Sequence, residues 1–167
     1  SYSYNYGGMR NKKTVGSQTI GQIWVGGQIT VDANGYNASC YIRGAGLIAM
    51  QDYSNGQFTS LVYYLFDAHG NVVNLIDNDG EKIKTYRYDA FGVEKNPDEN
   101  DTNPFRYCGE YFDKETGTIY LRARSYDPSI GRFTTRDSYT GSASDPLSLN
   151  LYTYCANNPL LYVDPSG

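Results

Sequence analysis

A seven-residue motif of the form aromatic-x-aromatic-Asp-x-x-Gly recurs along the chain and restricts it to a small group of folds. It occupies residues 64–70 and returns 22 residues later at 86–92. A third copy at 2–8 has Asn in place of Asp, and a degenerate copy lies at 126–131. Alternate aromatic residues place two rings on one face of a strand. The Asp or Asn can bond the main chain that follows it and start a turn, in which Gly adopts the positive φ.

These repeats predict an all-β fold made of antiparallel hairpins. Turn signals at 32–35, 54–56 and 77–80, with a further hairpin at 24–28, separate strand-like runs. The 18 Tyr among 167 residues support strands, because Tyr favours a half-buried pleated surface. A single hairpin cannot bury its face, so neighbouring hairpins must continue a twisted or spiralling sheet, and we expect this chain to end a longer array. One short helix is expected at 147–157, and an ordinary β-sandwich is the alternative fold.

Charge and hydropathy argue against several functional classes. A net charge of −4 and a pI of about 4.9 do not suit a nucleic-acid binder, which neutralises phosphates with basic residues. The longest apolar run, at 61–66, has six residues, so no transmembrane segment is expected. Residues 1–3 do not begin a signal peptide, and an export signal would lie upstream. We expect a secreted or cell-surface protein.

Few residues suit a metal site, and no cofactor is expected. His69 is the single His, which argues against a His-based metal site and a Ser-His-Asp triad. Residues 77–81 bring oxygen ligands together but lack the twelve-residue calcium loop, so they are interpreted as a hairpin turn. The acidic stretch at 96–101 predicts a flexible loop. The cysteines are odd in number and widely spaced, which leaves a single disulfide open among Cys40, Cys108 and Cys155.

A run of motifs follows the second full repeat in order. It comprises residues 86–92, 103–107, Gly109, Tyr111, 113–117, 120–128, 131–133, Asp137, 148–150, Tyr152, Tyr154, 157–159 and 164–167. These residues resemble the Tyr-Asp (YD) repeats of the Rhs family followed by its Rhs repeat-associated core domain. On this basis the chain divides into degenerate YD-type hairpin repeats at 1–60, YD repeats at 61–95 and the Rhs core domain at 86–167.

The resemblance implies a large β-sheet shell wound from YD repeats and closed at one end by the core domain. In similar proteins, including the shell component of insecticidal toxin complexes, the shell encloses a variable toxic C-terminal domain. The core domain is similar to an aspartic protease that cuts its own chain just past an Asp-Pro-x-Gly motif, whereas teneurins use a related YD shell for adhesion. The implied partners are a C-terminal toxin domain in cis and further YD repeats of the same polypeptide. Unpaired edge strands of the sheet also make self-association possible.

The resemblance also assigns a carboxylate pair. Hydrolysis of a peptide bond by carboxylates needs one ionised side chain that takes a proton from water and one neutral side chain that protonates the leaving nitrogen. The family places one Asp after a Gly-Arg-Phe motif and one in the Asp-Pro-x-Gly motif, which match Asp137 and Asp164. Its upstream Arg matches Arg124, whose guanidinium can hold one carboxylate ionised. In many relatives Pro follows the first Asp, but Ser138 follows it here and makes the loop less rigid. The cleavage motif is Asp164, Pro165, Ser166 and Gly167.

Structural interpretations of the same residues remain open. The cleavage motif is also an ordinary turn sequence, and Asp137 could cap a turn. Arg122, Arg124 and Arg132 could cover tyrosine faces by cation–π contact. If the chain is an enzyme, it acts once, in cis, and this stretch alone hydrolyses nothing in trans. The alternative function is a structural or adhesive YD module at the cell surface that binds glycan or protein without proteolysis.

Overall fold

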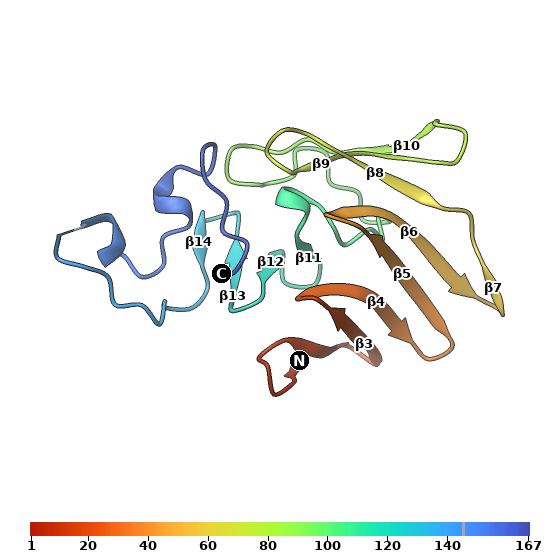
Figure 1. Ribbon diagram of the computed structural model, residues 1–167, viewed down its shortest axis with the longest axis horizontal. Coiled ribbons are helices and arrows are strands. Elements are labelled where there is room, and N and C mark those ends of the chain that lie inside the picture. Colours follow the sequence, from red (N-terminus) through yellow and green to blue (C-terminus); the bar gives the residue numbers. More distant parts are fainter. Residues whose placement is uncertain (145) are drawn as a thin grey trace. The chain divides into compact units, whose positions relative to one another are not determined.

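Antiparallel pairing of neighbouring strands builds the sheets of the computed structural model, which describes residues 1–144 and 146–167 (Figure 1). The expected all-β, antiparallel fold is confirmed. The described residues form two compact units, one of residues 1–66 with 73–85 and one of residues 67–72 with 86–167.

The first unit contains nearly all of a ten-stranded sheet in the order β1-β2-β3-β4-β5-β6-β8-β9-β10, with β7 paired to β6. The strands are β1 (Tyr2–Tyr4), β2 (Arg10–Val15), β3 (Gln18–Val25), β4 (Gln28–Asn34), β5 (Asn37–Arg43), β6 (Leu47–Ser54), β7 (Gln57–Phe58), β8 (Val62–Phe66), β9 (Val72–Ile76) and β10 (Lys82–Thr85). Short turns join neighbouring strands. Val25 pairs with Gln28 across one of them, which confirms the hairpin predicted at 24–28.

The Asp or Asn of the repeated motif builds the same turn four times. Asp67 Oδ1 accepts hydrogen bonds from the N–H groups of His69 and Asn71, both at 2.9 Å. The equivalent residues, which also accept from the second and fourth residues after them, are Asn5, Asp77 and Asp89. The glycine three positions after the Asp or Asn has a positive φ in all four of these turns: Gly8, Gly70, Gly80 and Gly92. The turn role predicted for this Asp is confirmed, and residues 77–81 prove to be a further copy.

A row of polar side chains crosses four strands of the first unit. Arg10 Nε donates to Gln22 Oε1 at 2.8 Å, and Gln22 Nε2 donates to Asp32 Oδ1 at 3.0 Å. The hydroxyl of Tyr41 donates to Asp32 Oδ2 at 3.0 Å. Arg10 is only 1% exposed, and a buried charge needs hydrogen-bonded partners to be tolerated. The row therefore ties β2 through β5 into one register.

The second unit contains a four-stranded sheet in the order β11-β12-β13-β14, together with short 3-10 turns. The elements are η1 (Tyr107–Gly109), β11 (Tyr111–Asp113), β12 (Thr118–Leu121), β13 (Arg124–Asp127), β14 (Arg132–Phe133), η2 (Pro146–Leu149) and η3 (Cys155–Asn157). The expectation of one helix at 147–157 is wrong, because the segment forms two separate 3-10 turns. Ala156 and Asn157 have φ values of 51° and 60°, a left-handed conformation that cannot continue a helix.

Tyrosine rings form much of the core of the second unit, and their hydroxyls bond the main chain. The fully buried cluster consists of Tyr107, Ile119, Leu121, Tyr126, Phe133 and Tyr154. The rings of Tyr126 and Tyr154 stack with their centroids 3.9 Å apart. The Tyr126 hydroxyl donates to Phe91 O at 2.7 Å, and the Tyr107 hydroxyl donates to Ala90 O at 3.0 Å. A tyrosine thus fills the core while its hydroxyl satisfies a carbonyl of the motif turn.

Alkaline pH is expected to unfold the second unit. Burial raises the pKa of Tyr86, Tyr107, Tyr126 and Tyr154 far above the ordinary value of 10.0. The unfolded chain loses these protons at a lower pH than the folded chain does. The contribution of the buried tyrosines to the free energy of unfolding is therefore fully present below pH 10 and falls as the pH rises above it. Each tyrosine contributes a loss of about 1.4 kcal/mol per pH unit. The part of the tyrosinate absorbance that comes from the buried rings should therefore appear in one steep step, together with the change in far-UV circular dichroism. Ionisation of all the tyrosines with unchanged circular dichroism would contradict this expectation.

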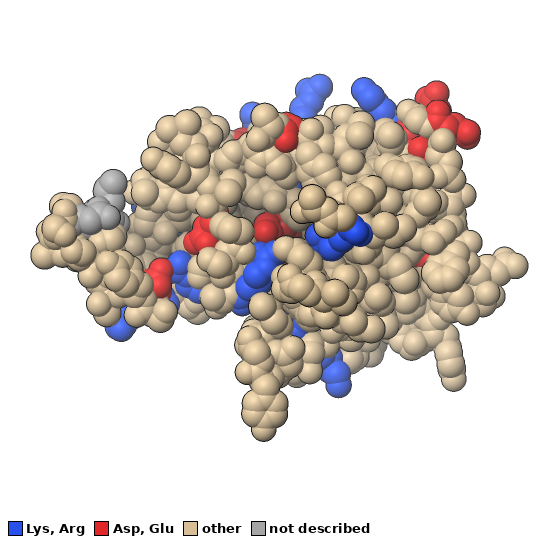
Figure 2. Space-filling view, viewed as in Figure 1, with Lys and Arg blue, Asp and Glu red and all other residues tan. Residues whose placement is uncertain are grey.

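Charged side chains are sparse and mixed on the face of the molecule seen in Figure 2. Basic and acidic side chains lie interspersed among uncharged residues rather than in one large patch of either sign. The composition accounts for this, since 14 basic and 18 acidic residues share a chain of 167. Most of that face is therefore made of uncharged residues.

Candidate functional site

The guanidinium of Arg124 lies between the two aspartates that the sequence analysis paired with it. Its Nη2 is 2.8 Å from Asp137 Oδ2 and 3.9 Å from Asp164 Oδ2. Arg124 begins β13, and its side chain is 9% exposed, against 32% for Asp137 and 26% for Asp164. The fold thus brings together all three residues proposed for catalysis. The low exposure of the guanidinium also limits screening of its charge by water.

The carboxylate of Asp137 is held by a local turn as well as by the ion pair. Its Oδ1 accepts a hydrogen bond from the Tyr139 N–H at 2.8 Å, while Oδ2 faces Arg124. The N–H of Asp137 donates to Leu151 O at 2.9 Å, and Arg124 Nη1 donates to the same oxygen at 3.2 Å. The turn and the ion pair use different oxygens, so the structural interpretation of Asp137 and its place in the site are compatible.

Asp164 starts the turn of the cleavage motif. Its Oδ1 accepts hydrogen bonds from the N–H groups of Ser166 at 3.1 Å and Gly167 at 2.9 Å. The turn presents Gly167 O to Arg124 Nε, which donates to it at 2.8 Å. One guanidinium therefore contacts both carboxylates and the main chain at the end of the motif.

An aromatic ring supports the same guanidinium. The Cζ atom of Arg124 lies 3.6 Å from the centroid of the Phe133 ring, so its cation–π partner is a phenylalanine and not the expected tyrosine. Arg132 Nη1 instead donates to Gly131 O at 3.2 Å and to the side-chain oxygen of Asn157. The ring of Phe133 and the bonds to Leu151 and Gly167 together hold the plane of the Arg124 guanidinium.

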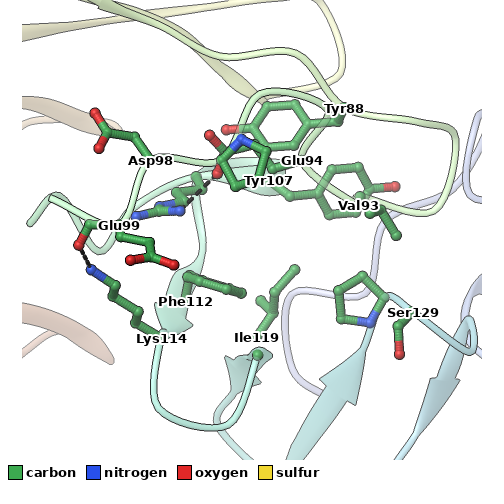
Figure 3. A pocket seen from close by; sticks show the side chains of 15 residues that line it. Tyr88, Val93, Glu94, Asp98, Glu99, Tyr107, Phe112, Lys114, Ile119 and Ser129 are labelled. Atoms are coloured by element: carbon green, nitrogen blue, oxygen red, sulfur yellow. Dashed lines mark hydrogen bonds and ion pairs between the residues drawn. The ribbon is translucent and has the colours of Figure 1, made fainter. Parts of the chain in front are cut away.

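A separate pocket of about 340 Å³ lies in the second unit (Figure 3). Its lining is mostly apolar and includes Tyr88, Val93, Tyr107, Phe112 and Ile119. Figure 3 shows these side chains gathered around the hollow. In its wall, Arg106 Nη1 pairs with Glu94 Oε2 at 2.7 Å. No residue of the carboxylate site lines this pocket, so the pocket is not the place where the two carboxylates meet.

The acidic stretch at 96–101 is anchored to the second unit. Asp101 Oδ2 lies 3.2 Å from Arg106 Nη2, and the Asp101 side chain is only 7% exposed. Lys114 Nζ bonds the main-chain oxygen of Glu99 at the rim of the pocket (Figure 3). The expected loop is confirmed, because residues 96–101 contain no helix or strand, and its flexibility stays a prediction.

Burial disfavours ionisation of the two thiols of the second unit. Burial raises the pKa of the Cys108 thiol from 9.0 to about 12 and that of Cys155 to about 11. Both thiols therefore stay protonated at neutral pH and are poor nucleophiles. Cys40, Cys108 and Cys155 are all free in the structure, which therefore contains none of the disulfides left open by the sequence. Within residues 1–144 and 146–167, no group of three or more His, Cys, Asp or Glu side chains is placed to hold a metal ion.

Contacts of Arg122 at the cleavage motif were not anticipated from the sequence. Its Nη1 lies 3.0 Å from Glu110 Oε2 and donates to Pro165 O at 2.6 Å. The sequence had suggested Arg122 only as a cover for a tyrosine ring. Its position two residues before Arg124 was no signal for this contact, because Arg122 has a φ of 65° and lies in a turn before β13 begins.

Comparison with known proteins assigns the family. Residues 32–160, more than half of the chain, match the Teneurin YD-shell family. The chain belongs to this family. The resemblance to Rhs and YD-repeat proteins inferred from the motif run is thereby confirmed.

Relatives of the YD-shell chain include toxins. The tRNA3(Ser)-specific nuclease WapA of Bacillus spizizenii is 35% identical over 177 residues, which cover 100% of this chain and 7% of that protein. The double-stranded DNA deaminase toxin A of Burkholderia cenocepacia is 32% identical over 116 residues, which cover 64% of this chain and 8% of that protein. Among solved structures, the crystal structure of TcdB2-TccC3-TEV matches with a TM-score of 0.73 at 23% identity, over 99% of this chain and 9% of that chain.

The YD-shell chain thus spans less than a tenth of the length of each of these relatives. It is a toxin-related Rhs shell segment. None of the helical elements described within residues 1–144 and 146–167 has the length and apolarity needed to cross a bilayer.

Proposed function

We propose that this chain is the end segment of a YD-repeat β-shell that encloses a C-terminal toxin domain. It releases that domain by one aspartic-type cut of its own polypeptide just after the motif at 164–167. The proposal is carried by one observation: the Arg124 guanidinium contacts Asp137, Asp164 and Gly167 O together. We also propose that the whole polypeptide works outside the cell that makes it, either secreted or on the cell surface.

The activities of the relatives support a carrier role for the shared segment. One relative is named as a tRNA nuclease and another as a DNA deaminase, yet both contain this segment in less than a tenth of their length. Two different reactions cannot both originate in one shared stretch, so their chemistry belongs to other parts of those chains. A shell end that releases whatever follows it is the function that such proteins can share.

The contacts of the site assign a role to each group. Asp137, in direct ion-pair contact with Arg124, acts as the base: it takes a proton from water while the water oxygen attacks the carbonyl carbon of the scissile bond. Asp164 uses Oδ1 for main-chain N–H groups, so Oδ2 carries the proton that passes to the leaving nitrogen as the C–N bond breaks. Arg124 stabilises the negative charge that develops on the carbonyl oxygen. The products are a new carboxyl end and a new amino end.

The test is a polypeptide that continues past Gly167 with its native residues. We expect it to split once, just after the motif, in a first-order reaction. Its rate should not depend on protein concentration, because the bond is tethered beside the carboxylates. Intact-mass spectrometry across a dilution series measures both the cut and its order. A polypeptide that stays whole would favour an adhesive or structural YD module, and a rate that rises with concentration would point to a separate protease.

A further inference from the structure

Three consecutive residues before and at the start of β13 bond the last three carbonyls of the cleavage motif. Arg122 Nη1 donates to Pro165 O at 2.6 Å, the Ala123 N–H donates to Ser166 O at 3.1 Å, and Arg124 Nε donates to Gly167 O at 2.8 Å. The motif is therefore held residue by residue along the segment 122–124. Only the third of these contacts involves a group of the carboxylate site.

An ion pair with Glu110 orients the side chain of Arg122 toward the motif. Its Nη1 lies 3.1 Å from Glu110 Oε1 and 3.0 Å from Oε2, and both side chains are 15% exposed. A charge-assisted contact of this kind, largely shielded from water, has a defined geometry. Arg122 also has a φ of 65°, a left-handed conformation that is unfavourable for a residue with a side chain. Backbone strain of this kind tends to collect at functional positions, where the surrounding structure maintains it.

The close fit at Gly167 restricts which residue can end the motif. Gly167 has a φ of 81°, and a Cβ atom there would lie 2.4 Å from Leu121 O and 2.8 Å from Arg124 N. Both neighbours are main-chain atoms, so they cannot move aside as a flexible side chain would. The segment 121–124 therefore accepts only glycine at this position.

We propose that Arg122 and Glu110 form a positioning pair that holds the cleavage motif in register beside the carboxylates. Glu110 orients Arg122, Arg122 holds the carbonyl of Pro165, and this places Gly167 where Arg124 can reach its oxygen. The pair acts through the main chain of the motif, by way of the hydrogen bond from Arg122 to Pro165 O. This inference rests on the proposed self-cleavage for its effect on rate, but the placement of the motif can be measured without any cleavage.

The test has two arms, both in the polypeptide that continues past Gly167. The first arm measures the cleavage rate and the site of the cut for Arg122→Ala, Arg122→Lys and Glu110→Gln. The second arm measures hydrogen exchange of residues 121–125 and 164–167 in an Asp137→Asn background. Arg87→Ala is the matched control, because Arg87 is an exposed arginine of the same unit.

We expect Arg122→Ala to cleave about 100-fold more slowly, since a misplaced scissile bond loses most of the benefit of proximity. Exchange at Ala123 and across the motif should become roughly five- to tenfold faster as a hydrogen bond is lost. Arg122→Lys keeps a donor and should restore part of the cleavage rate and part of the protection from exchange. Glu110→Gln should give cleavage and exchange rates between those of wild type and Arg122→Ala. Arg87→Ala should match wild type in both rates.

Unchanged exchange in Arg122→Ala overturns the positioning role, whatever happens to the rate. Faster exchange with an unchanged cleavage rate overturns its importance for the reaction. If the unmodified polypeptide is not cleaved at all, the proposed function fails while the exchange arm still decides whether Arg122 holds the motif.

Discussion

Asp137→Asn is expected to abolish the self-cleavage proposed for this chain while leaving the fold intact. Asparagine keeps the side-chain oxygen that accepts the Tyr139 N–H, so the local turn survives. The substitution removes the charge that pairs with Arg124 and the group that takes a proton from water. General acid–base catalysis of this type contributes about 10²–10⁴-fold to a rate. The measurement is the fraction of polypeptide cut over time, with circular dichroism to check folding.

Asp164→Asn should have a comparable effect, because it removes the proton donor for the leaving nitrogen while its oxygen can still accept the N–H groups of Ser166 and Gly167. The matched control is Asp127→Asn, which alters another turn-forming aspartate of the second unit, one that accepts the Ser129 N–H at 2.9 Å. That variant should cleave at the wild-type rate. If Asp137→Asn and Asp164→Asn both cleave as fast as wild type, the aspartic mechanism is wrong.

Gly92→Ala is expected to cause the largest loss of stability of any alanine substitution in the motif turns. Gly92 has a φ of 93°, and an added Cβ would lie 2.6 Å from Cγ and 2.7 Å from Cδ1 of Tyr107. Tyr107 cannot move away easily, because the residue is only 3% exposed and its hydroxyl donates to Ala90 O in the same turn. Left-handed strain and overpacking together should lower the free energy of unfolding by roughly 2–5 kcal/mol. Chemical denaturation measures this loss.

Gly80→Ala separates the two causes. Gly80 occupies the same turn position with a φ of 82°, but nothing lies within 4 Å of an added Cβ there. Left-handed strain alone should therefore lower the free energy of unfolding of this variant, by about 1–2 kcal/mol. Equal losses in the two variants would show that contact with Tyr107 plays no part in the effect at Gly92.

Much of the secondary structure could be predicted because it depends on local chemistry. The Asp or Asn of each motif closes its turn with hydrogen bonds to residues two and four positions later, so a short stretch of sequence is sufficient to identify it. The copy at 77–81 was recognised as a turn but not as a repeat, since it lacks the aromatic pair before its Asp. The prediction of a helix at 147–157 was wrong because residues near its end adopt a left-handed conformation. These residues are not glycines, so the sequence contained no signal for that conformation.

The candidate site depended on contacts between distant parts of the chain. The motif resemblance named Arg124, Asp137 and Asp164, but it could not show that one guanidinium nitrogen lies within 4 Å of both carboxylates. Glu110 gave no signal, since an acidic residue twelve positions before Arg122 is not placed beside it by any local rule. The ion pair between Arg106 and Asp101 in the acidic stretch could not be predicted for the same reason, because the fold brings the two side chains together.

The sequence by itself determined the all-β class, the hairpin turns and the family, because turn closure and strand alternation act over a few residues and the motif run is specific. The tertiary structure alone decided which side chains meet: the row from Arg10 to Tyr41, the tyrosine core over the motif turns, and the segment 122–124 along the cleavage motif. The physical reason is that hydrogen bonds and ion pairs form only within about 3–4 Å. Whether residues far apart in the sequence come that close depends on the register of every strand between them.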